Sequence, residues 1–187
     1  MSKNLAKDKK TIVQGSILDV ARSRRMKPED VLAEADVVVM LDTSYSMGGS
    51  KTRQAEQALK DIQRTFPGRV ILIEFSSVAT FRWNGLPLWM YDNTMMGKAI
   101  EKALEFKGLG MKFYFISDGV PSDGDLALDW AKKLNEPITT IFIGHERDTR
   151  GQAFLRRLSA VAGGQTIDHV EVKKLAQTVT KLLTEGK

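Results

Sequence analysis

The chain has 187 residues, of which 42% are hydrophobic and 27% charged, and its formal net charge is +5. This balance is typical of one soluble globular domain, since single domains usually run to about 100–200 residues. The sequence has no run of about 18 apolar residues that would predict a membrane span, and no apolar segment follows the basic N-terminus as in a secretory signal. We therefore expect a cytoplasmic protein. The absence of cysteine excludes disulfides and thiolate metal sites.

The basic charge is concentrated in residues 1–33, which form an N-terminal leader. This leader holds eight Lys and Arg against four Asp and Glu, whereas residues 34–187 hold twenty against nineteen. A helix is predicted from about Ile12 to Arg25 and a second short one from Pro28, with the rest of the leader disordered. A basic arm can bind nucleic acid, so an RNA- or nucleic-acid-binding role stays open as an alternative.

Residues 34–187 are predicted to form one α/β domain, because β-rich segments alternate with helical ones. Four segments are almost continuously apolar, as central parallel strands are when both of their faces are buried. They are VVVML leading to Asp42, VILIEF at 70–75, KFYFI at 112–116 and ITTIFI at 138–143. The run ATFRW at 79–83 follows VILIEF so closely that it predicts a hairpin and one antiparallel edge strand.

Five segments after these strands carry apolar residues at the three-and-four spacing of an amphipathic helix. Their apolar positions are Ala55, Ala58, Leu59, Ile62 and Phe66; Met96, Ala99, Ile100, Ala103 and Leu104; Ala127, Trp130, Ala131 and Leu134; Phe154, Leu158 and Val161; and Val172, Leu175, Ala176, Val179 and Leu183. The predicted fold is a Rossmann-like open sandwich, with a mostly parallel central sheet, one antiparallel edge strand and helices on both faces.

Three loops carry oxygen-bearing side chains at or near the ends of these segments. Asp42, Ser44 and Ser46 follow the first strand, Thr94 precedes a helix, and Asp118 ends a later strand. In an open parallel sheet, ligands gather beyond the carboxyl ends of the strands. Residues at alternate positions of an extended loop face one side, so the first three side chains are expected to face one point. Two carboxylates and three hydroxyls suit Mg²⁺ better than zinc, and Mn²⁺ or Ca²⁺ also take oxygen ligands.

The motifs DTSYSM, NTMMGKAIEKAL and FISDGVPSDGD, in this order, resemble the metal-ion-dependent adhesion site of the von Willebrand factor type A domain, over about residues 35–184. The resemblance implies direct metal contact by Ser44, Ser46 and Thr94, with Asp42 and Asp118 holding coordinating waters or contacting the ion. It also implies that an Asp or Glu of a partner protein completes the metal shell. Intracellular bacterial members are often paired with AAA+ ATPases or assembly factors, so such a partner is expected here.

The loop before Thr94 departs from the family pattern. Members often have glycine before the threonine, whereas Asp92 and Asn93 stand there in this chain. The preceding PLWMY is apolar and bulky, and its Trp89, Met90 and Tyr91 form either a contact surface beside the metal or a local cover for the core.

An enzyme is not expected, because the sequence has no Gly-rich phosphate loop ending in Lys-Ser/Thr, no GxGxxG after the first strand and no GxSxG. No catalytic residue is therefore assigned. The favoured hypothesis is a non-enzymatic, Mg²⁺-dependent protein-binding module. Nucleic-acid binding through the leader is the alternative, and a metal-assisted hydrolase is the third hypothesis.

Overall fold

A computed structural model of the protein describes residues 11–90, 92–145, 147–168, 170–171 and 174–185. Its centre is a six-stranded sheet with the strand order β3-β2-β1-β4-β5-β6. The pairing of β2 with β3 is antiparallel and every other pairing is parallel. The strands are β1 (Val37–Asp42), β2 (Val70–Phe75), β3 (Ala79–Phe81), β4 (Lys112–Ser117), β5 (Ile138–Phe142) and β6 (Thr166–Ile167). The predicted fold class and the antiparallel edge strand are confirmed.

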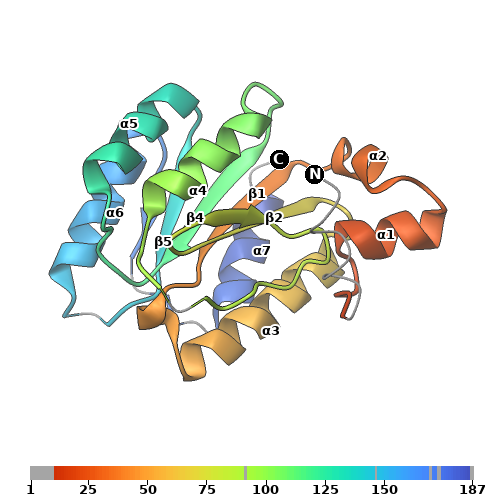
Figure 1. Ribbon diagram of the computed structural model, residues 1–187, viewed down its shortest axis with the longest axis horizontal. Helices are drawn as coiled ribbons and strands as arrows, with labels where there is room; N and C mark the ends of the chain where they lie inside the picture. The colour runs from red at the N-terminus through yellow and green to blue at the C-terminus, as the bar shows by residue number, and fades with distance from the viewer. Residues whose placement is uncertain (1–10, 91, 146, 169, 172–173, 186–187) are drawn as a thin grey trace.

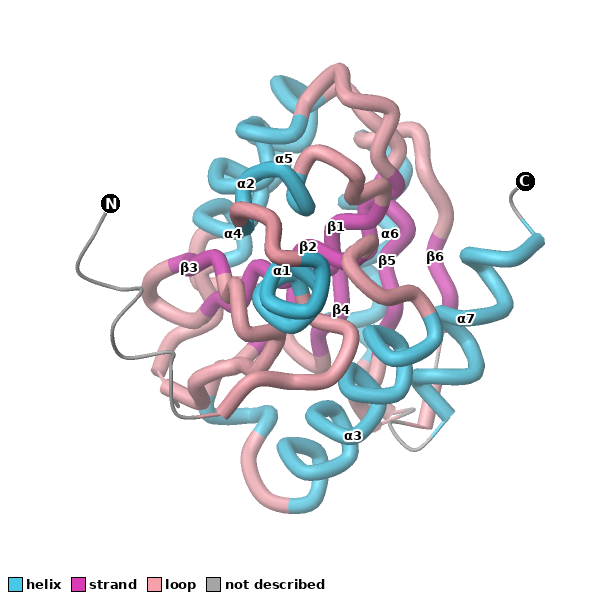
Figure 2. Tube along the Cα trace, turned by 90° about the vertical axis from the view of Figure 1, so that its right-hand side faces the viewer, coloured by secondary structure: helices cyan, strands magenta, loops and turns pink. Residues whose placement is uncertain are grey.

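Helices cover both faces of the sheet. Figure 1 shows α4, α5 and α6 on one side of the strands and α3 and α7 on the other, and Figure 2 shows the latter pair from a second direction. The helices are α1 (Ile17–Arg24), α2 (Pro28–Leu32), α3 (Ser50–Thr65), α4 (Met96–Ala103), α5 (Gly124–Leu134), α6 (Thr149–Val161) and α7 (Leu175–Glu185), with short 3-10 turns η2 (Tyr45–Met47) and η3 (Leu104–Phe106).

The core has two halves because successive side chains of a strand point to opposite faces of the sheet. In β1, Val38 and Met40 pack with the α4 side, whereas Val37, Val39 and Leu41 pack with α3 and α7. All six residues of β1 are buried, and so are all six of β2. This burial on both faces explains why these strands are apolar without alternation.

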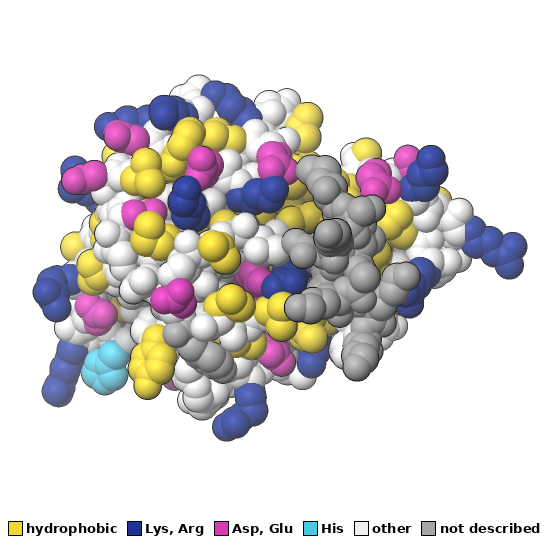
Figure 3. Space-filling model, viewed as in Figure 1, with side chains coloured by type: hydrophobic (Ala, Val, Ile, Leu, Met, Phe, Trp, Pro, Cys, Tyr) yellow, Lys and Arg dark blue, Asp and Glu magenta, His cyan; other side chains and the backbone are white. Residues whose placement is uncertain are grey.

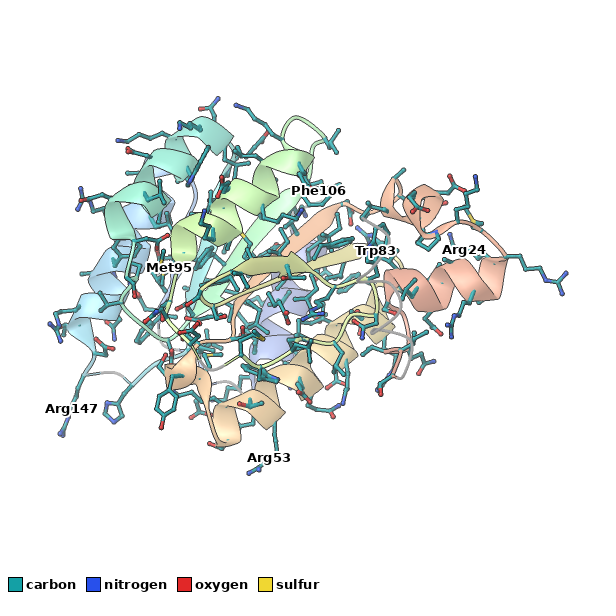
Figure 4. The ribbon with its side chains drawn as sticks, viewed as in Figure 1. Arg24, Arg53, Trp83, Met95, Phe106 and Arg147 are labelled. Carbon is teal, nitrogen blue, oxygen red and sulfur yellow. The ribbon has the colours of Figure 1, made fainter. Side chains whose placement is uncertain are left out.

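Part of the predicted leader belongs to this core. Ile17, Val20 and Val31 are buried in the same cluster as the α4 side of the sheet. The backbone N–H of Leu18 donates to the carbonyl of Trp83 at 3.1 Å, and α1 lies beside Trp83 in Figure 4. The predicted boundary after residue 33 is therefore not a break in packing. The first predicted helix begins later than expected, at Ile17, because Ser16 accepts a hydrogen bond from the Asp19 N–H and caps it.

Two details of the predicted elements need correction. Strand β6 was not predicted, since two residues are too few to show a pattern. On α6 the predicted apolar face included Val161, but that side chain is exposed. The buried positions of this helix are Gly151, Leu155, Leu158 and Ser159. Val172, predicted on the last helix, lies outside the described residues. Within the described ranges, no helix is both long and apolar enough to cross a membrane.

Candidate metal site

The candidate site lies at the carboxyl ends of β1 and β4. These strands are neighbours in the sheet and run parallel, with Leu41 opposite Ile116. Asp42, the last residue of β1, and Asp118, the residue after β4, are therefore brought to the same edge. Both carboxylates are buried. The sheet register thus joins two acidic residues that are 76 positions apart in the sequence.

The first loop folds into a tight turn after Asp42. One carboxylate oxygen of Asp42 accepts the backbone N–H of Ser44 at 2.8 Å. The next residues form the 3-10 turn η2, and its buried Met47 holds the turn against the core. The hydroxyls of Ser44 and Ser46 then lie 3.1 Å apart. The backbone of this loop is therefore not extended as predicted, although the turn still brings the two hydroxyls together.

Glycine is required at only one of the two positions after this turn. Gly49, the N-cap of α3, has φ +76°, which non-glycine residues rarely adopt. Gly48 is extended, with φ −63° and ψ 167°. The change of direction into α3 is thus made at Gly49 alone.

Side-chain hydrogen bonds join the first loop to the third. The hydroxyl of Ser46 donates to Oδ1 of Asp118 at 2.7 Å. The hydroxyl of Ser117 donates to Oδ2 of Asp42 at 2.6 Å. Ser117 was not predicted as a site residue, although its position immediately before Asp118 at a strand end was an available signal. Asp42, Ser44, Ser46 and Asp118 therefore form one connected polar cluster.

The second loop reaches the cluster through its backbone. The N–H of Tyr45 donates to the carbonyl of Asp92 at 3.1 Å, and the N–H of Ser122 donates to the carbonyl of Thr94 at 2.9 Å. The half-buried Thr94 side chain forms no hydrogen bond with the other four predicted residues, all of which are described. The structure thus places Thr94 between the first and third loops without joining its hydroxyl to the cluster. Met95, the next residue, marks the start of α4 in Figure 4.

The electrostatics of the cluster favour a cation. The pKa of Asp42 is raised to about 6; burial is the main cause, the hydrogen bonds from Ser117 and Ser44 oppose the rise, and the nearby carboxylate of Asp118 adds to it. A positive charge is already present, because the Lys51 ammonium of α3 forms an ion pair with Asp118 and donates to the carbonyl of Ser46 at 3.1 Å. A buried carboxylate near another is stabilised in its charged form by a cation.

A third acidic residue, Asp123, supports the loops instead of joining the cluster. Its Oδ2 accepts the N–H of Gly97 at 2.9 Å, so it caps the first turn of α4 from a different loop. Its Oδ1 is buried and has no hydrogen-bond partner among the described residues. Burial raises the pKa of this carboxyl. Asp123 therefore fixes the start of α4, two residues after Thr94.

The residues present fit an oxygen-binding divalent ion. The described part of the chain contains no group of three or more His, Cys, Asp or Glu side chains that could hold a metal ion, so a site here would depend on hydroxyl ligands as well. The cluster instead offers two carboxylates and adjacent hydroxyls, which are the ligand types of Mg²⁺. The contact of Lys51 with Asp118 and Ser46 shows that a cation is accommodated there.

A cavity of about 290 Å³ lies beside the cluster, with Thr43, next to Asp42, in its wall. The buried ion pair of Glu74 with Arg82 forms part of its wall. Its lining also includes the exposed apolar side chains of Val78, Leu88 and Met90.

The apolar loop residues predicted to be either a contact surface or a core cover differ in their exposure. Trp89 packs partly against the core, and its indole N–H donates to Glu56 at 2.7 Å. Met90 is exposed, and Tyr91 lies outside the described residues.

Comparisons with known proteins show resemblance at the level of the fold. No protein-family model matches the sequence, and no curated protein matches it. An aerotolerance-related membrane protein from Bacteroides fragilis NCTC 9343, solved with multiple mutations to serines, aligns with a TM-score of 0.59 and 17% identity, over 81% of this chain and 99% of that one. Proximal thread matrix protein 1 from the mussel byssus aligns with a TM-score of 0.55 and 16% identity, over 80% of this chain and 46% of that one. The chain therefore has an α/β, Rossmann-like fold consistent with the von Willebrand factor type A architecture.

Proposed function

We propose that the protein is a non-enzymatic, Mg²⁺-dependent binding module whose metal site captures an acidic side chain of a partner protein. The observation that carries this proposal is the cluster in which Ser44 contacts Ser46 and Ser46 contacts Asp118, beside the buried Asp42. These residues come from two loops and offer oxygen ligands of the type that Mg²⁺ prefers.

The hydroxyls of Ser44 and Ser46 would hold the ion, and the carboxylates of Asp42 and Asp118 would neutralise it. Thr94 stays a predicted third hydroxyl ligand, because its loop is tied to both of the others by backbone hydrogen bonds. When bound, the ion would supply an electron-poor centre for one more anionic oxygen. An Asp or Glu of a partner has such an oxygen.

The surface beside the cluster supports a protein as the partner. Tyr45, between the two serines, is 79% exposed, and Leu88 and Met90 are exposed at the neighbouring cavity. Aromatic and Met side chains are enriched where proteins bind one another. An AAA+ ATPase or assembly factor as that partner, and a cytoplasmic location, stay predictions.

The test compares wild-type protein with Asp42→Asn and Ser46→Ala. Metal binding is measured directly with Mn²⁺, and partner capture is measured with Mg²⁺ or with a chelator. Both variants should lose metal binding and capture while keeping the circular dichroism spectrum of the wild type. Asp125→Asn, a change in the first turn of α5 directly after the third loop, is the matched control and should behave like wild type. Capture that persists in Asp42→Asn and in chelator would contradict the proposal.

The face of the molecule drawn in Figure 3 gives no specific support to the nucleic-acid alternative. On the face drawn in Figure 3, Lys and Arg side chains are spread around the outline and mixed with Asp and Glu. Part of the leader's helical region is also buried in the core. The alternative predicts binding that weakens steeply with salt, which a titration with labelled RNA would measure.

A further inference from the structure

Lys51 lies in the first turn of α3 and points into the candidate site. Its ammonium forms an ion pair with Oδ2 of Asp118 and donates to the carbonyl of Ser46 at 3.1 Å. The Asp118 side chain is only 1% exposed, whereas that of Lys51 is 34% exposed. A nearly buried carboxylate is therefore paired with a lysine that still reaches solvent.

The two contacts of Lys51 bridge the same loops that a metal ion would bridge. Asp118 belongs to the third loop and Ser46 to the first, and their side chains also meet directly at 2.7 Å. An ammonium carries one positive charge and three donors on a flexible four-carbon stem. It can thus neutralise Asp118 in this position and can also leave it for solvent.

We propose that Lys51 is a tethered cation that holds Asp118 and the first loop together and competes with the divalent ion for Asp118. This inference rests on the proposed function, because it concerns the same metal site. Filling of the site then requires the ammonium to leave Asp118. The contact therefore weakens metal binding and raises the metal concentration at which the site fills.

Lys51→Met tests this competition, because methionine keeps an unbranched chain and removes the charge. Lys60→Met is the control, since it lies nine residues further along the same helix, about 13 Å away at 1.5 Å per residue. Lys51→Arg keeps the positive charge. The measurement is Mn²⁺ binding to the full chain by electron paramagnetic resonance, with Mg²⁺ as competitor, and thermal unfolding in chelator.

We expect Lys51→Met to bind Mn²⁺ on the order of tenfold more tightly than wild type, which corresponds to about 1.4 kcal/mol. In chelator its melting temperature should fall by about 2–4 °C, since Asp118 loses its partner. Lys60→Met should match wild type in both measurements, and Lys51→Arg should stay within about threefold of wild type in Mn²⁺ affinity.

The outcomes separate this inference from the proposed function. Equal or weaker Mn²⁺ binding by Lys51→Met than by wild type would overturn the competition and leave the metal site standing. An unchanged melting temperature in chelator would overturn the tether. If folded wild type and all variants bind no Mn²⁺, the proposed function fails and this inference fails with it.

Discussion

Asp42→Asn should stabilise the metal-free protein at neutral pH, although it removes a predicted site residue. Burial raises the pKa of Asp42 from 3.8 to about 6. The folded protein therefore binds this proton more tightly than the unfolded chain does. The stabilisation from the protonated carboxyl is complete below about pH 4 and is lost as the pH rises through 6. Asparagine has nearly the same shape and cannot ionise.

The size of this stabilisation follows from the change in the pKa of Asp42 on folding. A rise from 3.8 to about 6, at 1.36 kcal/mol for each pKa unit, gives a cost of about 3 kcal/mol for keeping Asp42 ionised in the folded state above pH 6. The asparagine carbonyl can still accept the Ser44 N–H, but its amide cannot accept the Ser117 hydroxyl as Oδ2 does. Losing that hydrogen bond costs about 1 kcal/mol, so we expect a net gain of about 2 kcal/mol.

Urea unfolding in chelator measures this gain. At pH 7.5, Asp42→Asn should be about 2 kcal/mol more stable than wild type. At pH 4 the advantage should disappear, because wild-type Asp42 is then largely protonated. A difference between the two proteins that is the same at pH 4 and 7.5 would refute the reasoning, because the cost would not come from ionisation. A wild type that is more stable at pH 7.5 would refute it as well.

Three further predictions concern the metal, the cavity and the leader. Wild-type protein should gain about 2.7 kcal/mol of stability in Mg²⁺ at a hundred times its Kd, and Ser46→Ala should gain clearly less; equal gains would contradict the assigned site. Arg82→Met should cost about 3–5 kcal/mol in urea unfolding because it leaves Glu74 buried without its ion-pair partner, and Glu74→Met in the same chain should restore most of that loss; no rescue would count against the charge explanation. Gly15→Ala should lower stability by at least about 1–3 kcal/mol, since φ is +82° and the added carbon would meet the Gln63 carbonyl oxygen at 2.1 Å; a neutral substitution would show that the leader is not docked as described.

Local chemistry determined much of this protein from its sequence. Strand β2 has the predicted bounds and β1 differs from prediction by one residue, because burial on both faces demands nearly continuous apolar side chains. In the structure, Asp42 and the loop of Asp118 lie at the same edge of the sheet, and Ser46 contacts Asp118. Parallel strands end at the same edge, so a polar residue after each strand is brought near the others. The metal and the partner stay predictions.

Tertiary structure alone decided which atoms meet. The hydrogen bond from Ser117 to Asp42 depends on the register of β4 against β1. The cap that Asp123 places on α4 depends on how the loop before α5 packs against that helix, so the sequence shows neither partner. In the sequence, Lys51 cannot be told apart from any solvent-exposed lysine of a helix. Only the approach of α3 to the end of β4 pairs its ammonium with Asp118. The leader shows the same limit: its composition is basic, yet four apolar side chains of α1 and α2 are buried in the core cluster. Patterns along the chain fix which side chains need burial, but the partner that buries each one is set by packing between elements.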